Sequence, residues 1–253
     1  MCKINVYLDH AATSPLLLST KKYLLSILDD YGNPSSKYDL GIKSKEIIDQ
    51  ARKNIQKFIN AKSIDDILFT SSASASITLA ITKLKTNKPY YVLYSPIAHK
   101  SMILSCKSVN NSKPLCVDHD GFIDLEYLTN LLLIVSKNYT PLVCVDCANS
   151  EIGTIQDLYS ISKITKEYGG LFFGDATGYI SSIPLDVQNL QFDLLAFSGH
   201  KLGGLKGCGV LYKNSNVNLC PLIYGTQEQG IIGGTENVLG IASLGEAVKY
   251  YSY

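Results

Sequence analysis

Short apolar runs recur along the chain, and each one ends in a polar or glycine-bearing segment. Runs without alternation are typical of strands that are buried on both faces of a sheet. The segments between them place apolar residues every three to four positions, which is the pattern of one helical face. Ile47 to Ile59 is the clearest of these segments. The expected strands are residues 66–70, 90–94, 142–146, 171–175 and 193–197, and further helices are expected over 155–168 and 237–251.

The order of these elements predicts the fold class. Strands alternate with helices, which is typical of a parallel sheet that is covered by helices on both faces. We therefore expect an α/β fold of three layers, with a mainly parallel sheet flanked by helices. Asn110 to Pro114 is polar and is expected to be a surface loop.

The 253 residues include 23 lysines and arginines against 22 aspartates and glutamates, which gives a formal net charge of +1. This balance provides no general positive field for a phosphate backbone, so a nucleic-acid partner is not expected. Hydrophobic residues make up 46% of the chain, which excludes disorder as its overall state. No window approaches the ~20 apolar residues that span a bilayer, and Met1 to Asn5 lacks the apolar region of a secretory signal. We therefore expect a cytoplasmic protein without a membrane partner.

The seven cysteines are an odd number and are expected to be reduced thiols in that compartment. Cys144 and Cys147 form a C-x-x-C pair, but residues three apart in a strand face opposite sides, and no second pair completes a zinc site. We expect both to be buried structural residues and expect no metal site.

Three strand ends offer candidate chemistry, because ligands of an open parallel sheet bind beyond the carboxyl ends of its strands. The hydroxyl-rich run Thr70 to Ser76 can bind an anion at the start of the next helix, or it can simply cap that helix. Asp175 can pair with a protonated ring nitrogen or cap a helix. Lys201 offers an amine that can form an imine with a carbonyl cofactor, although a lone lysine there is more often solvated. Together these are the parts of a pyridoxal phosphate site.

The chain also resembles the class V aminotransferase group of fold-type I pyridoxal phosphate enzymes, and within it the NifS/IscS-like cysteine desulfurases. The matching strings occur in the family's order from end to end of the chain. They are Tyr7 to Pro15, Tyr31 to Ser36, Glu151 to Gly153, Asp175 to Thr177, Ser198 to Lys201 and Gly234 to Asn237.

The resemblance implies the large-domain fold of these enzymes, with pyridoxal phosphate as cofactor. Lys201 would form the covalent link to the cofactor, and Asp175 would pair with its pyridinium nitrogen. His99 would stack on the cofactor ring and act in proton transfer. The phosphate would be held by Ala73, Ser74, Ser198 and His200, with Thr235 reaching it from the partner subunit of a homodimer.

Several positions depart from the family pattern. The turn Ser72 to Ala75 replaces the usual Gly-Gly-Thr-Glu or Gly-Ala-Thr-Glu and keeps a hydroxyl at Ser74. Ser150 stands where the family has a second asparagine, and Gly178 stands where it has a glutamine. Both family residues usually hydrogen-bond the cofactor's phenolic oxygen. Ser150 can replace that bond in part and Gly178 cannot, so we expect the cofactor to be tuned differently.

The larger departure is length. Residues 1–253 are expected to be an N-terminal segment plus the cofactor-binding large domain, without the family's small C-terminal domain. That domain carries the mobile loop with the nucleophilic cysteine and the arginine that grips the substrate carboxylate. None of the seven cysteines takes that position. Arg52, the single arginine, is expected on the exposed side of its helix and offers no carboxylate clamp.

Three functions are compatible with these residues. The leading one is a cysteine desulfurase, which takes L-cysteine or a related amino acid and leaves alanine and an enzyme persulfide. Its sulfur would pass to a sulfur-acceptor protein for iron-sulfur clusters or thiolated tRNA, and the isolated chain is expected to be inactive. The alternatives are another class V reaction, such as transamination or elimination, and a truncated, non-catalytic dimerising or binding module.

Overall fold

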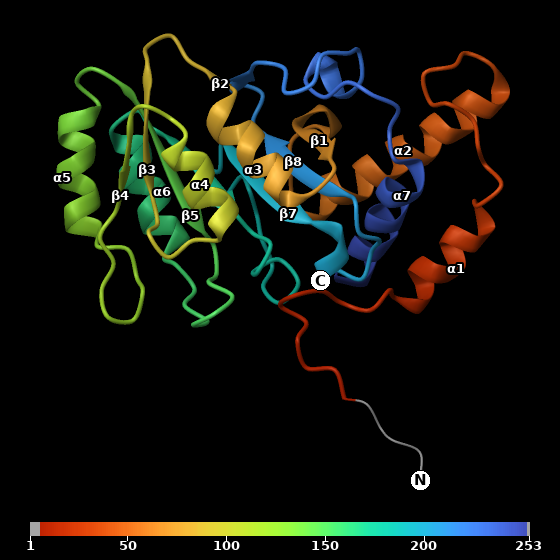
Figure 1. The fold of residues 1–253 in the computed structure, drawn as a ribbon, viewed down its shortest axis with the longest axis horizontal. Coiled ribbons are helices and arrows are strands. Elements are labelled where there is room, and N and C mark those ends of the chain that lie inside the picture. The colour runs from red at the N-terminus through yellow and green to blue at the C-terminus, as the bar shows by residue number, and fades with distance from the viewer. Residues whose placement is uncertain (1–5, 252–253) are drawn as a thin grey trace.

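The computed structural model describes residues 6–251, which form a three-layer α/β fold around a seven-stranded sheet (Figure 1). The expectation that Met1 to Asn5 carries no secretory signal lies outside these residues, as does the continuation of the chain at 252–253. Among residues 6–251, no helix is both long and apolar enough to cross a bilayer.

The α-helices are α1 (Leu18–Ser26), α2 (Asp39–Phe58), α3 (Ala73–Thr82), α4 (Lys100–Lys107), α5 (Leu125–Val135), α6 (Leu158–Glu167) and α7 (Val238–Ala247). The strands are β1 (Ile67–Thr70), β2 (Leu84–Lys85), β3 (Tyr90–Tyr94), β4 (Ser112–Pro114), β5 (Thr140–Asp146), β6 (Leu171–Asp175), β7 (Leu194–Ser198), β8 (Gly209–Lys213) and β9 (Asn218–Leu219). Short 3₁₀ helices are η1 (Ile64–Asp66), η2 (Gly199–Lys201), η3 (Glu228–Gly230) and η4 (Val248–Tyr251).

The main sheet has the order β1-β8-β7-β6-β5-β3-β4. Its neighbours from β4 to β7 are parallel, whereas β8 runs antiparallel to both β7 and β1. The prediction of a mainly parallel sheet is therefore confirmed, and the five expected strands are β1, β3, β5, β6 and β7. Since β8 is antiparallel to both of its neighbours, β1 points the same way as β7. The carboxyl ends of all five expected strands thus lie at one edge of the sheet.

Several elements differ from the expectation, including the small sheet of β2 and β9, which was not expected. Asn110 to Pro114 is not only a loop, because Ser112–Pro114 forms the parallel edge strand β4. β8 was not among the expected strands. The helix expected over 237–251 is α-helical only to Ala247 and then tightens into η4.

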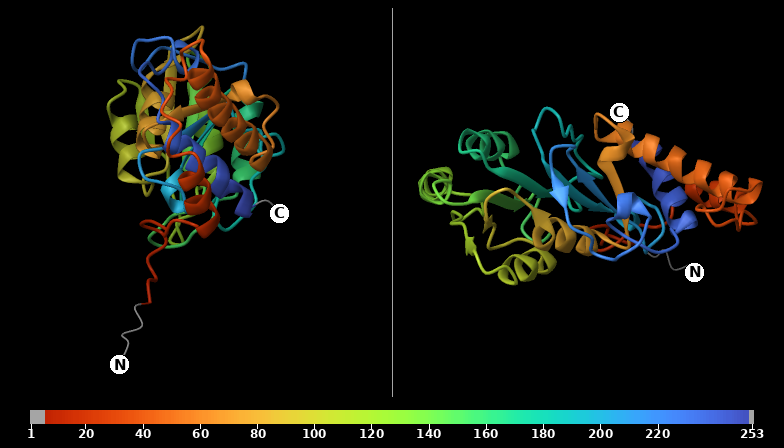
Figure 2. Two further views of the ribbon diagram at one scale, coloured as in Figure 1. Left: turned by 90° about the vertical axis from the view of Figure 1, so that its right-hand side faces the viewer. Right: turned by 90° about the horizontal axis from the view of Figure 1, so that it is seen from above.

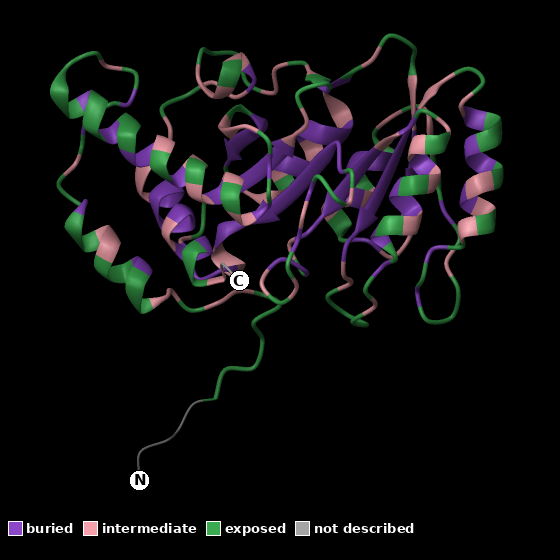
Figure 3. Cartoon of the chain, turned by 180° about the vertical axis from the view of Figure 1, so that it is seen from behind, coloured by how far each residue is buried: buried purple, intermediate pink, exposed green. Residues whose placement is uncertain are grey.

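Helices cover both faces of the sheet (Figure 2). Two apolar clusters fill the space between the layers. α2, α5, α6 and α7 pack on one face, and α3 and α4 pack on the other. Phe172 on β6 stacks on Phe192 with ring centroids 4.7 Å apart. Each fully buried apolar side chain of this size stabilises the fold by roughly 1.5–3 kcal/mol. Figure 3 shows the buried sheet and the largely exposed helix α1, which lies outside these layers.

Candidate functional site

A cavity of about 400 Å³ opens at the edge of the sheet where the parallel strands end. It lies between the ends of β5, β6 and β7 and the starts of α3 and α4, as expected for a ligand site of an open parallel sheet. The predicted site residues that line it are Ala73, Ser74, His99, Ser150, Asp175, Ser198, His200 and Lys201. Thr235 does not line it and instead borders a separate cavity of about 230 Å³.

The first turn of α3 presents free hydrogen-bond donors to this cavity. Ser72 caps the helix by accepting the Ala75 N–H at 3.1 Å. The amides of Ala73 and Ser74 belong to the first turn, where a helix offers no intrahelical acceptor. Aligned peptide dipoles also make this end of the helix positive. The wall of the cavity formed by α3 therefore suits an anionic group.

Gly209 fixes the position of that helix start. A Cβ at Gly209 would lie 2.4 Å from the backbone carbon of Ser72, so only glycine allows β8 to begin this close to α3. The contact sets α3 against the sheet and brings its first turn to the cavity.

Lys201 lies in η2, directly after β7, and the N-terminal segment of the chain holds this turn in place. The Ser14 hydroxyl donates to the Lys201 carbonyl at 2.9 Å, and the Ser14 N–H donates to the His200 carbonyl at 3.0 Å. Thr13 Oγ1 lies 3.0 Å from His200 Nδ1. Burial lowers the pKa of His200, and the charges of Lys201 and Lys206 lower it further.

His99 combines a structural position with a place at the cavity. It is the N-cap of α4, because its Nδ1 accepts the Ser101 N–H at 3.2 Å, and it also lines the cavity. A neutral imidazole whose Nδ1 accepts carries its proton on Nε2. His99 therefore offers an Nε2–H donor.

Two carboxylates lie side by side at the end of the sheet. Asp175 ends β6 and Asp146 ends β5, and the two residues are paired in register. Both are 5% exposed and both line the cavity. Asp175 Oδ1 accepts the Thr177 N–H at 2.9 Å. Burial raises the pKa of Asp146, and the charge of Asp175 adds to this effect.

Sequence reasoning found Asp175 but not Asp146. The signal was the same for both, because each is the acid that ends a buried apolar run. Asp146 Oδ2 accepts from Asn149 Nδ2 at 3.2 Å, whereas its Oδ1 is buried without a hydrogen-bond partner. The Thr177 hydroxyl, also at the cavity, is buried and unpartnered in the same way.

Two of the departures from the family pattern lie together at one side of the cavity. Ser150 and Gly178 both line it. A Cβ at Gly178 would lie 3.0 Å from the Ala148 carbonyl oxygen, which is tighter than ordinary contact. A longer side chain at position 178 therefore requires the backbone around Ala148 to move.

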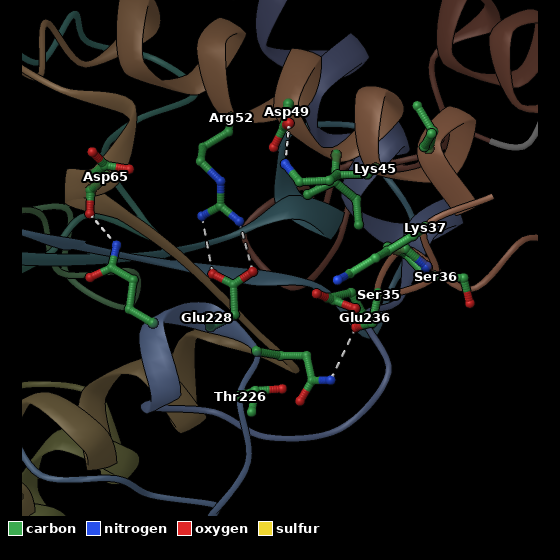
Figure 4. Close-up of a pocket in the computed structure, with 15 residues that line it drawn as sticks. Ser35, Ser36, Lys37, Lys45, Asp49, Arg52, Asp65, Thr226, Glu228 and Glu236 are labelled. Atoms are coloured by element: carbon green, nitrogen blue, oxygen red, sulfur yellow. Dashed lines mark hydrogen bonds and ion pairs between the residues drawn. The ribbon is translucent and has the colours of Figure 1, made fainter. Parts of the chain in front are cut away.

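Arg52 is not exposed, contrary to the prediction. Its side chain is 14% exposed and forms a two-pronged ion pair with Glu228, at 2.7 Å and 3.1 Å (Figure 4). Arg52 also donates to the Ile67 carbonyl and lies over the Phe69 ring, 4.7 Å from its centroid. The pair borders a separate, larger cavity of about 630 Å³, which contains none of the predicted site residues. Arg52 does not line the cavity of the predicted site, and its guanidinium is held by Glu228 and the Ile67 carbonyl.

Cysteines contribute nothing to the cavity within residues 6–251. Cys144 and Cys147 are fully buried, as predicted, and belong to the apolar clusters on opposite faces of the sheet. Of the remaining described cysteines, Cys116 and Cys220 are exposed. No group of three or more potential metal ligands gathers in the part of the chain that the structure describes.

Residues 6–253 match the family model of aminotransferase class V. The chain belongs to this family. A class V relative, the cysteine desulfurase IscS of Dictyoglomus turgidum, is 37% identical over 98% of the chain. The solved structure of a NifS-like protein from Rickettsia africae has a TM-score of 0.90 at 33% identity, covering 97% of this chain and 68% of the other. The structure of SspA in complex with cysteine has a TM-score of 0.88 at 31% identity, covering 97% and 73%.

This class V chain spans only part of its relatives. It covers 64% of the length of the Dictyoglomus turgidum protein and 66% of a putative cysteine desulfurase of Bacillus subtilis, to which it is 36% identical. The activity of those whole proteins therefore does not pass to this chain directly.

Proposed function

We propose that this chain is the cofactor-binding part of a cysteine desulfurase and holds pyridoxal phosphate in the cavity at the end of the sheet. The observation that carries the proposal is that Lys201, Asp175 and the first turn of α3 all open onto one cavity. Three strand ends that are far apart in the sequence thus bring an amine, an acid and an anion-binding helix start together.

The residues around the cavity fit this cofactor. The first turn of α3, Ser198 and His200 provide the donors that a phosphate group needs. Asp175 provides an acceptor for a protonated ring nitrogen. The buried, unpartnered oxygens of Asp146 and Thr177 leave polar capacity unused, as expected of a polar site that receives a ligand.

Lys201, Asp175 and His99 have different roles toward the bound cofactor. When bound, pyridoxal phosphate supplies a ring that withdraws electrons from the α-carbon of an amino acid. Lys201 provides the amine that holds the cofactor's carbonyl carbon, and that amine can afterwards accept or return a proton. Asp175 keeps the ring nitrogen protonated. His99 lines the cavity and offers its Nε2 proton to a reacting group.

The proposed substrate is L-cysteine or a related amino acid, because the relatives include cysteine desulfurases and a protein solved with cysteine. No cysteine lines the cavity within residues 6–251, and Arg52 is bound to Glu228. We propose that the nucleophilic thiol and the group that binds the substrate carboxylate come from the part of the longer relatives that residues 1–253 do not match.

The proposed assembly is a cytoplasmic homodimer that delivers sulfur to an acceptor protein for iron-sulfur clusters or thiolated tRNA. Thr235 supports the dimer, because it is exposed and lies outside the cavity of its own chain. In this arrangement Thr235 reaches the phosphate of the partner subunit.

Trapping with borohydride tests the cofactor site. The purified chain is incubated with pyridoxal phosphate, reduced, and mapped by peptide mass spectrometry. We expect one adduct on Lys201, which is absent in Lys201→Ala and present in Lys163→Ala, where an exposed lysine on α6 is removed instead. An adduct pattern that follows surface lysines and is the same in all three proteins rejects the proposal.

A second measurement concerns turnover. With cofactor and L-cysteine, the isolated chain is expected to release neither alanine nor sulfide. Because the contacts at Ser150 and Gly178 depart from the family pattern, absorbance changes with a panel of other amino acids are measured in parallel. A change with another amino acid and none with L-cysteine favours a different class V reaction.

A further inference from the structure

We infer that Asp146 is a second acid of the cofactor site, which acts beside Asp175 to keep the ring nitrogen of the bound cofactor protonated. The inference rests on the proposed function and extends it to a residue that the family resemblance does not assign. It stands on the position of the side chain, on its unpartnered oxygen and on the charges around it.

The position follows from the sheet. β5 and β6 are parallel neighbours, and Asp146 pairs in register with Asp175. Paired residues of adjacent parallel strands point to the same face, and the strands themselves lie about 4.7–4.9 Å apart. Both carboxylates line the same cavity. A ligand that contacts Asp175 therefore lies within the electrostatic reach of Asp146.

The groups that contact Asp146 are neutral hydrogen-bond donors and not cations. Asn149 donates to Oδ2, Oδ1 is buried without a hydrogen bond of good geometry, and the nearby Ser95 hydroxyl lowers the pKa of Asp146. Within residues 6–251, neither Asp146 nor Asp175 has an ion-pair partner. A buried carboxylate without a partner is costly, so a cationic ligand group at this place relieves that cost.

The surrounding charges determine how Asp146 titrates. In the cavity without a ligand, burial raises the pKa of Asp146 and the charge of Asp175 adds to this, whereas hydrogen bonds from the backbone, Ser95 and Asn149 oppose it. A protonated ring nitrogen reverses this balance, because the positive charge favours ionised Asp146 and the two acids together favour the charged ring. The other titratable or charged groups at the cavity or next to Asp146 are Cys147, directly after it, His99 and Lys100 at the start of α4, Glu151 in the following loop, and His200 and Lys201 in η2.

The test measures the protonation state of the cofactor, not turnover. Pyridoxal phosphate labelled with ¹⁵N in the ring is bound to the wild-type chain, to Asp146→Asn and to Asp29→Asn, and the ring-nitrogen shift is followed with pH. Asparagine at position 146 keeps the size of the side chain and an oxygen for Asn149. Asp29 is an exposed carboxylate outside the cavity, so its variant is the matched control.

We expect the midpoint of ring deprotonation to fall by about one pH unit in Asp146→Asn and to stay unchanged in Asp29→Asn, because one neighbouring charge typically has an effect of this size. Equal midpoints in wild type and Asp146→Asn overturn the inference. If Asp146→Asn does not fold, the pKa of Asp146 is measured in the wild type from the pH dependence of its carboxyl ¹³C signal, with and without cofactor. The inference requires that this pKa fall when the cofactor binds. The proposed function itself is tested by the borohydride trapping, and absence of any Lys201 adduct in the wild type overturns it independently of this titration.

Discussion

The buried pair of Arg52 and Glu228 allows a quantitative prediction. Arg52→Ala removes both contacts to Glu228, the hydrogen bond to the Ile67 carbonyl and the stacking on Phe69. The side chain of Glu228 is 5% exposed and keeps only its hydrogen bond from the Phe69 N–H, at 2.9 Å, with no cation beside it. Breaking a buried ion pair from one side typically costs about 3–5 kcal/mol. With roughly 2–4 °C per kcal/mol for a chain of this size, Tm is expected to fall by about 6–20 °C.

The assay is urea unfolding followed by circular dichroism, with calorimetry for Tm. Lys45→Ala is the matched control, because it removes a basic residue of the same helix from the exposed Lys45–Asp49 pair. The control is expected to change the free energy of unfolding by less than about 0.5 kcal/mol. The double variant Arg52→Ala/Glu228→Ala is expected to lose less than the sum of the single variants, because no unpaired charge stays buried. A loss below about 1 kcal/mol for Arg52→Ala refutes the reasoning and places the pair among ordinary surface ion pairs.

Three further predictions concern the site and its surroundings. Gly209→Ala is expected to push β8 away from Ser72, which lowers Tm and weakens cofactor binding in a fluorescence titration; unchanged binding contradicts the role given to this contact. Burial raises the pKa of Cys208 to about 12, so at pH 8 a thiol reagent is expected to modify Cys116 and Cys220, which are exposed, and to reach Cys208 only after unfolding, as peptide mapping will show. The pKa of His200 is lowered by burial and by Lys201, so the unfolded state binds more protons and stability is expected to fall as pH drops through about 6.5. In His200→Asn, unfolding curves collected from pH 5 to 8 are expected to lose this component.

The sequence alone predicted the buried strands well, because a strand covered on both faces requires an uninterrupted apolar run. β4 has no such run, since Ser112–Pro114 lies at the sheet edge and is intermediate or exposed at every position. Helical spacing placed Arg52 on the polar side of α2, but its partner Glu228 comes from a distant loop that periodicity cannot reveal. Burial of a charged side chain is decided by such long-range contacts.

The candidate site shows the same division. Strand ends in a parallel sheet converge by topology, so the sequence pattern was enough to assign Asp175 and Lys201 to one site. Asp146 also ends a buried run, but it was read only as the last residue of the expected strand. Which hydrogen bonds the Asp146 carboxylate forms depends on how the chain packs around it, and no pattern in the sequence reveals this.

The antiparallel strand β8 also has a consequence for the order in which the protein is made. β1 has one neighbour in the sheet, and its Ile67 pairs with Tyr212 of β8. At a synthesis rate of about 5–20 residues per second, β8 leaves the ribosome on the order of ten seconds after β1. During that interval β1, whose residues are all buried in the folded chain, has no strand to pair with. β1 therefore stays unpaired until β8 has been made, and the sheet edge that supports α3 is completed only after that point.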